Sequence, residues 1–174
     1  MAVAAAPGHP VTRLVLNDVG PHIPAAALRR IRDYLAGASA GQPMRFADLG
    51  ALERHLRLIH APFGPLTDAQ WALLARNSAR GLPAGGLMLH YDPKIGDPLL
   101  GTEPDDVDMW ALWKRIDIPV LVLRGETSDL LLPETLERMR GAGAQVCIVP
   151  QTGHAPALMD PVQIAAIKTF LDVP

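Results

Sequence analysis

Two mainly apolar runs, each followed by a polar loop, constrain the fold of this chain more than any other feature. The first spans residues 119–123 and the second spans residues 145–150. Apolar runs of this length are typical of strands that are buried on both faces of a sheet. Between them, residues 133–140 show a helical pattern with Pro in its first turn and Gly141 just past its end. Strand, helix and strand in this order predict a right-handed parallel crossover.

Each of these two predicted strands ends in a loop with a residue suited to catalysis. Asp129 follows the first strand, and His154 follows the second. Ligands of parallel sheets bind beyond the carboxyl ends of the strands, and neighbouring strands lie only about 4.8 Å apart. We therefore expect Asp129 and His154 to form a hydrogen-bonded pair that activates a nucleophile. The alternatives are a turn or helix-capping aspartate and an ordinary surface-loop histidine.

A third strand is expected over residues 11–17, so the predicted fold class is α/β with three parallel strands and flanking helices. The outer edge of this strand has no evident partner in the sequence. Each unpaired backbone group buried there would cost about 1–3 kcal/mol, and a bare apolar edge promotes association. One interpretation is therefore a non-catalytic binding or assembly module that pairs through residues 11–17 with a second copy or another protein.

The long segment between the first and second strands has the character of an insertion. Thr67 and Gln70 have the spacing of a capping box at the start of one of its helices. Helical excursions between strands are typical of caps over an active-site edge. The sequence thus predicts a core over 1–22 and 107–174 and a helical cap over 23–106. The helical patterns of the whole chain cover residues 23–35, 46–59, 66 onwards, 107–115, 133–140 and 161–171.

Composition argues against several classes of protein. The chain is 49% hydrophobic and 20% charged, as folded proteins are. A net charge of −2 gives no basic surface for nucleic acid or an anionic membrane, and no apolar run approaches the roughly 20 residues of a membrane span. Cys147 is alone, so we expect neither disulfides nor a cysteine metal site. The Ala-rich start lacks the basic leader of a signal peptide, and a cytoplasmic location is expected.

Three segments together resemble the α/β-hydrolase family: Leu14–Pro21, Pro119–Asp129 and Thr152–Pro156. Their order and the helical excursion after the first segment are similar to the carboxyl-terminal half of a cap-bearing member. The resemblance covers essentially the whole chain. It implies a serine hydrolase, such as an esterase, that acts on an ester or similar acyl bond of a small molecule. It also implies that Asp129 is the catalytic acid and His154 the catalytic histidine, without a cofactor.

The same resemblance implies where the nucleophile belongs. In the family, the oxyanion-hole loop and the nucleophile elbow precede the strand that resembles residues 11–17, and residues 1–10 resemble the tail of the helix after the elbow. The expectation is a truncated enzyme that supplies the acid, the histidine and the cap. Such a chain is inactive by itself and gains activity only when an amino-terminal half chain completes it.

Other residues offer weaker alternatives. Asp18 is a second candidate acid, because some family members carry the carboxylate after the preceding strand, but a turn residue is the favoured interpretation. Ser39 lies in a G-x-S-x-G match and precedes Asp129 and His154 in the family's order, which allows a minimal hydrolase that uses Ser39. That motif needs a strand before it, whereas a helical pattern precedes Ser39, so a flexible linker is favoured. Ser78, at the end of a helix, has less support.

The remaining polar and aromatic residues point to no further chemistry. Glu126 and Ser128 are expected to shape the loop of Asp129. Tryptophans are more often core residues than ligand platforms, although in a cap they can line an apolar acyl pocket. No metal site is expected, because the other histidines lack metal-ligand spacing: His9, His22, His55, His60 and His90.

Overall fold

The computed structural model describes residues 1–39, 44–92, 94, 97, 101 and 103–172 and divides into two compact units. The first, here called the sheet unit, comprises Met1–Ala25, Pro62–Pro65 and Asp105–Pro174. The second, here called the helical unit, comprises Ala26–Ala61 and Leu66–Pro104. The assignment of an inserted cap to residues 23–106 stays a prediction.

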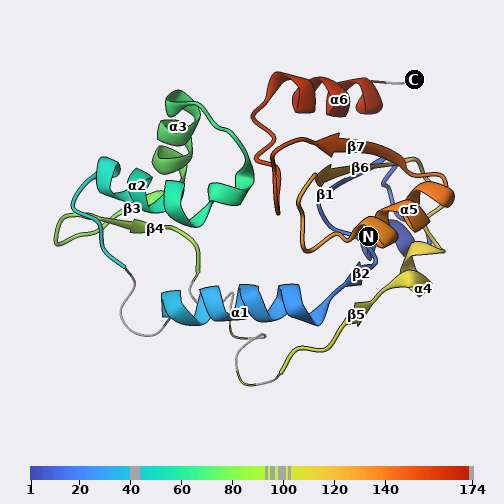
Figure 1. Cartoon of the computed structure of the whole chain (residues 1–174), viewed down its shortest axis with the longest axis horizontal. Coiled ribbons are helices and arrows are strands. Elements are labelled where there is room, and N and C mark those ends of the chain that lie inside the picture. The colour runs from blue at the N-terminus through green and yellow to red at the C-terminus, as the bar shows by residue number, and fades with distance from the viewer. Residues whose placement is uncertain (40–43, 93, 95–96, 98–100, 102, 173–174) are drawn as a thin grey trace. The chain divides into compact units, whose positions relative to one another are not determined.

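The sheet unit contains a parallel sheet of three strands in the order β1-β6-β7 (Figure 1). The central strand, β6, pairs with β1 from Leu14↔Val120 to Asn17↔Leu123. It pairs with β7 from Leu121↔Gln145 to Gly125↔Val149. The bounds of the main elements are β1 Leu14–Asn17, β6 Val120–Gly125, α5 Pro133–Gly141, β7 Gln145–Val149 and α6 Pro161–Leu171. The predicted α/β class with three parallel strands and flanking helices is confirmed.

Strand β6 is buried along its whole length, which explains its unbroken apolar sequence. Successive side chains of a strand point to opposite faces. Val120 and Val122 pack into one core cluster, together with Leu136 and Met139 of helix α5. Leu121 and Leu123 pack into another cluster, which contains Phe170 of helix α6. The two helices therefore cover different faces of the sheet and hold β6 between them.

The helical unit is built on a pair of helices and a hairpin. Leu52 and Leu56 of one helix pack against Trp71 and Ala75 of the next in a single buried cluster. Thr67 and Gln70 form the predicted capping box at the start of the second helix. The bounds of the elements, including the short helix η2 at the border of the two units, are α1 Ala25–Ser39, α2 Leu49–Ile59, η2 Ala61–Phe63, α3 Asp68–Ser78, β3 Ala79–Gly81 and β4 Leu87–Leu89.

Some predicted boundaries differ from the structure. The helix expected over 107–115 is divided into strand β5, Val107–Asp108, and the short helix α4, Trp110–Trp113. Strand β5 pairs with β2, His22–Ile23. The Asp108 carboxylate accepts the N–H of Trp110 at 2.8 Å, so the helix begins only there. The short helix η1, Val3–Ala5, stands where the end of a longer helix was expected.

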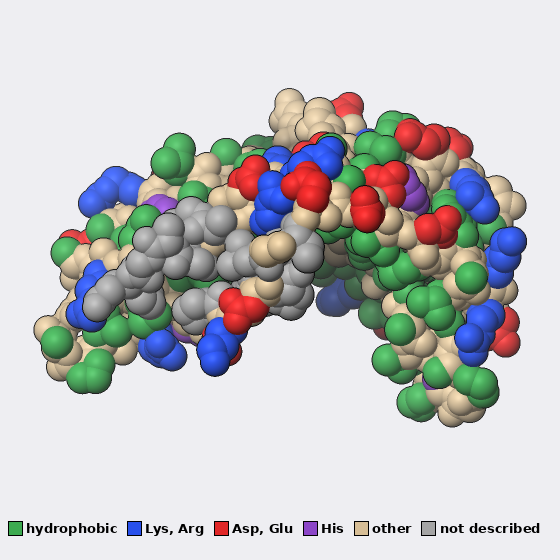
Figure 2. Space-filling view, turned by 90° about the horizontal axis from the view of Figure 1, so that it is seen from below, with side chains coloured by type: hydrophobic (Ala, Val, Ile, Leu, Met, Phe, Trp, Pro, Cys, Tyr) green, Lys and Arg blue, Asp and Glu red, His purple; other side chains and the backbone are tan. Residues whose placement is uncertain are grey.

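The surface agrees with the low net charge. On the face seen in Figure 2, Lys and Arg side chains are interspersed with Asp and Glu side chains. Within the described part of the chain, no helix is both long enough and apolar enough to cross a membrane.

The close approach of the loops that follow β6 and β7 predicts a strict requirement for glycine at position 125. A Cβ atom there would collide with the carbonyl oxygen of Gly153 and lie 2.7 Å from that of Thr152. We expect Gly125→Ala to destabilise the fold by about 2–3 kcal/mol, which lowers Tm by roughly 5–10 °C. The control is Gly141→Ala, because that helical position has no atom within 4 Å of a new Cβ. Equal Tm values for the two variants would contradict this packing.

Candidate catalytic site

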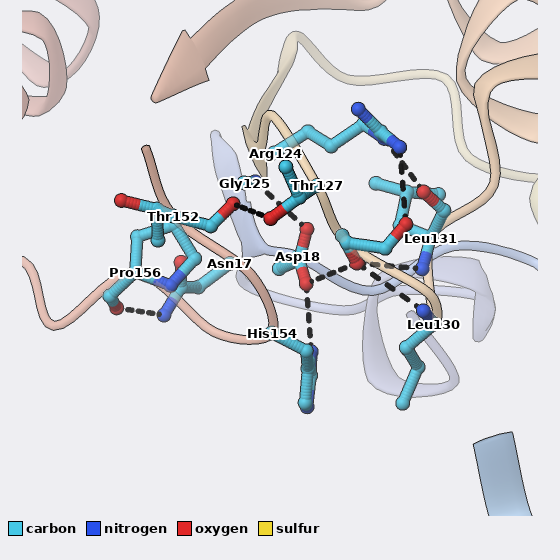
Figure 3. A network of polar contacts seen from close by, with 11 residues as sticks. Asn17, Asp18, Arg124, Gly125, Thr127, Leu130, Leu131, Thr152, His154 and Pro156 are labelled. Atoms are coloured by element: carbon cyan, nitrogen blue, oxygen red, sulfur yellow. Dashed lines mark hydrogen bonds and ion pairs between the residues drawn. The ribbon is translucent and has the colours of Figure 1, made fainter. Parts of the chain in front are cut away.

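The structure places the carboxylate of Asp18 against the imidazole of His154. The Nδ1 atom of His154 lies 2.7 Å from Oδ2 of Asp18 (Figure 3). Asp18 follows β1 and His154 follows β7, so the outer strands of the sheet each supply one member of the pair. The ring extends from Asp18 away from the other side chains of the network. The carboxylate thus holds the imidazole by one nitrogen and leaves Nε2 pointing outward.

Asp18 is fully buried, and its oxygens are satisfied by donors from both neighbouring loops. Oδ1 accepts the N–H of Gly125 at 3.0 Å. Oδ2 accepts the hydroxyl of Ser128 at 2.7 Å in addition to His154. The backbone of Asp18 has φ +55°, and its N–H donates to the carbonyl oxygen of Leu123 at 2.7 Å. Asp18 is therefore a turn residue, as expected, and also the partner of His154.

The loop after β6 is held from inside by Arg124. This buried guanidinium donates to three backbone carbonyl oxygens: Leu131 at 2.6 Å, Glu126 at 2.9 Å and Ser128 at 3.1 Å. The Ser128 hydroxyl in turn accepts the N–H groups of Leu130 and Leu131, each at 3.2 Å. These bonds fix the position of the hydroxyl that reaches Asp18.

The loop that carries His154 is tied to the other two strand ends. The side-chain amide of Asn17 donates to the carbonyl oxygen of Pro156 at 2.9 Å. The backbone N–H and the hydroxyl of Thr127 both donate to the carbonyl oxygen of Thr152, at 2.9 and 3.1 Å. The N–H of Gly153 donates to the carbonyl oxygen of Pro62 at 2.8 Å. Hydrogen bonds of the residues that precede and follow His154 thereby fix its position.

The carboxylate that lies 2.7 Å from Nδ1 of His154 belongs to Asp18, whereas the sequence predicts Asp129 as the partner of His154. Asp129 is exposed, between the buried residues Ser128 and Leu130. Both aspartates follow neighbouring strands of the sheet, as the sequence indicates. The roles of Asp129 and His154 as catalytic acid and histidine stay predictions, and the geometry adds Asp18 as the rival acid.

The other candidate residues lie elsewhere. Ser39 is the last residue of helix α1, which runs four residues beyond the expected end at Leu35, so a helix and not a strand precedes it. The rest of the predicted linker, 40–43, lies outside the described residues. Ser78 ends helix α3. In the described residues no group of three or more His, Cys, Asp or Glu side chains is placed to hold a metal ion.

Cys147 lies on strand β7 and is only partly buried, although a buried strand was expected. Burial raises the pKa of its thiol.

Comparison with known proteins matches residues 1–167 to the family described as the alpha/beta hydrolase family. The chain belongs to the α/β hydrolase family. A structure of an alpha/beta hydrolase from Novosphingobium aromaticivorans is 36% identical, with a TM-score of 0.81, over 97% of this chain and 59% of its own. A structure from Rickettsia typhi is 29% identical, with a TM-score of 0.85, over 98% of this chain and 56% of its own.

This member of the α/β hydrolase family is also similar to a named hydrolase. The 3-hydroxybutyrate-oligomer hydrolase of Cupriavidus necator is 39% identical over 98% of this chain. The chain spans 60% of the length of that relative.

The contact between Asp18 and His154 predicts a spectroscopic difference between the two aspartates. A proton held between an imidazole nitrogen and a buried carboxylate gives a low-field signal in the proton NMR spectrum. We expect Asp18→Asn to abolish this signal and to destabilise the fold by about 1–3 kcal/mol. Asp129→Asn is the matched control and should keep the signal. The reverse pattern would show that Asp129 is the partner of His154.

Proposed function

We propose that this chain supplies the acid, the histidine and the cap of a serine hydrolase that cleaves an ester or similar acyl bond of a small molecule. The observation that carries the proposal is the 2.7 Å contact between the fully buried Asp18 and Nδ1 of His154. A buried carboxylate at Nδ1 fixes the tautomer in which Nε2 is free to accept a proton. Asp18 is thus the acid that the geometry favours.

The chemistry follows from this arrangement. A serine Oγ attacks the acyl carbon while Nε2 of His154 takes the hydroxyl proton. Asp18 stabilises the imidazolium, which then gives the proton to the departing alkoxide or alcohol oxygen as the acyl–oxygen bond breaks. Water attacks the acyl-enzyme, again losing its proton to Nε2, and the serine leaves with that proton as the acid product is released. His154 therefore cycles between one and two protons, and Asp18 stays ionised.

The nucleophile is assigned to a segment outside these 174 residues. The serines of the sequence are Ser39, Ser78 and Ser128. Ser39 and Ser78 end helices. Ser128 is buried and bonds the acid rather than the outward side of His154. A nucleophile elbow is a sharp turn from a strand into a helix that exposes the serine hydroxyl. A helix precedes both Ser39 and Ser78, and Ser128 is buried in the longer loop between β6 and α5.

The substrate class is proposed from the relative. The Cupriavidus necator protein is named a 3-hydroxybutyrate-oligomer hydrolase, and such oligomers are chains of hydroxyacyl units joined by esters. Ester cleavage needs the groups supplied here, a histidine and its acid, together with an oxyanion hole and a serine. We therefore propose a short hydroxyacyl ester as the substrate.

A chimera tests the proposal. The part of the Cupriavidus necator hydrolase that the match leaves uncovered is joined to this chain, and hydrolysis of a 3-hydroxybutyrate dimer is followed. We expect activity that falls about 10⁴-fold in Asp18→Asn and about 10⁶-fold in His154→Ala. Asp129→Asn should remain close to the parent chimera. Full activity of the His154→Ala chimera would refute the assignment.

The chain by itself should not react with a fluorophosphonate probe of serine hydrolases, because the proposal assigns the serine and the oxyanion hole to another segment. Intact mass after incubation measures this directly, with Ser39→Ala and His154→Ala chains alongside. An adduct that both substitutions abolish would show instead a minimal hydrolase that uses Ser39.

A second candidate function is assembly through the free edge of β1. Among the described residues, β1 pairs with β6 alone. The N–H groups of Leu14 and Asp18 face β6, since they donate to Pro119 and Leu123. Backbone N–H groups point to alternate sides along a strand, so the N–H of Val15 points to the outer edge. This edge is available to a second copy or to an amino-terminal half chain.

The substitution Val15→Pro tests whether the chain assembles through this edge or associates by another surface. Proline removes only an outward donor at an edge strand, so the pairing with β6 should persist. If the edge mediates assembly, light scattering should show a dimer of the unsubstituted chain and a monomer of Val15→Pro. A monomer in both cases would exclude self-assembly through this edge.

A further inference from the structure

A cavity of about 310 Å³ lies entirely within the helical unit. Its size is at the lower end of the range of small-molecule sites. None of the described residues that line it belongs to the sheet unit, which contains Asp18 and His154. The residues that line it come from α1, from α2 and the residue after it, from the end of α3, and from the end of β4 and the segment after it: Tyr34, Leu35, Leu56, His60, Ser78, Leu89, His90 and Tyr91.

The cavity has an apolar wall with a buried base. Leu56 is only 1% exposed, whereas Leu35 and Leu89 are partly exposed. Leu56 also belongs to the packed cluster of the helical unit, so this side of the cavity is fixed by the core. Tyr34 and His90 are exposed and lie where the cavity meets solvent. A ligand can therefore enter past polar side chains and rest on aliphatic ones.

The polar groups that line the cavity are hydroxyl and imidazole groups. They are two phenols, two imidazoles and the hydroxyl of Ser78, and the described lining contains no Lys, Arg, Asp or Glu. Burial, with a smaller effect of Tyr91, raises the pKa of Tyr34, so the phenol keeps its proton. Burial, with a smaller effect of His55, lowers the pKa of His60, so its imidazole is uncharged at neutral pH.

We propose that this cavity binds an uncharged small molecule with an ester or hydroxyl group on a short aliphatic chain. The aliphatic part contacts Leu35, Leu56 and Leu89, and the oxygens meet the hydroxyl and imidazole groups around them. A free carboxylate is disfavoured, because no Lys or Arg side chain lines the described part of the cavity to offset its loss of hydration. The ester class rests on the proposed function, whereas the preference for a neutral ligand rests on the lining alone.

Methyl-labelled full-length chain tests this by NMR, with ethyl 3-hydroxybutyrate as the neutral probe and 3-hydroxybutyrate as its charged counterpart. We expect the ester to cause saturable shifts at the methyl groups of Leu35, Leu56 and Leu89. The anion should bind at least about tenfold more weakly, which corresponds to ~1.4 kcal/mol. Equal binding of ester and anion, or no saturable shift at these methyl groups, would overturn the proposal.

Cavity-filling variants locate the site independently. Ser78→Phe and Leu35→Trp add bulk from α3 and α1 and should each abolish the ester shifts. Asn77→Phe is the matched control, because Asn77 is the exposed neighbour of Ser78 and does not line the cavity. Shifts that persist in both filling variants would overturn the proposal. The map of shifted methyl groups in the unsubstituted chain stands even if a variant fails to fold.

His154→Gln separates this inference from the proposed function. The substitution removes the imidazole of the catalytic site but lies in the other unit. Ester binding in the cavity should be unchanged, whereas hydrolysis by the chimera should be lost. Loss of the cavity shifts in His154→Gln would overturn the separate site and leave the catalytic proposal standing.

Discussion

A carboxylate that is entirely removed from water controls the arrangement of the three strand ends. Asp18 is 0% exposed, and a buried charge without partners would be very costly. It is offset by donors from the ends of both other strands: the N–H of Gly125, the hydroxyl of Ser128 and the imidazole of His154. The loops after β6 and β7 cannot move away without leaving this charge unpaired. The geometry of the site is thus a consequence of burying Asp18.

The scaffold around this charge depends on a second buried polar group. Arg124 lies at the end of β6 and gives its donors to three carbonyl oxygens of the next loop, where no helix or strand would satisfy them. The loop is therefore rigid without regular structure, and Ser128 is held at hydrogen-bond distance from Asp18. Packing of β6 between helices α5 and α6 fixes the strand from which Arg124 extends. Burial of apolar side chains fixes the position of β6, and hydrogen bonds to the buried carbonyl groups fix the loop that follows it.

Much of the fold could be predicted from local patterns, but the site could be predicted only in part. The strands around Val122 and Val146, and the helix that begins at Pro161, have signals within their own residues. The hairpin of β3 and β4 was missed because both strands have only three residues, too few for periodicity. Arg124 was missed because a charged residue at a strand end is usually solvated. Its role depends on carbonyl groups whose directions no sequence pattern reveals.

The choice between two acids shows why the sequence was insufficient. Asp18 and Asp129 both follow strands that end at the same edge of the sheet, so strand spacing permits either to reach His154. The loop after β6 distinguishes the two aspartates: Ser128 and Leu130 are buried, and Asp129 between them is exposed. A hydroxyl is the suitable inward group, because it donates to the carboxylate already buried there, whereas a second carboxylate would repel it. Ser128 and Asp18 are therefore complementary. The identity of residue 128 is as informative as that of residue 18 for predicting which carboxylate is buried beside His154.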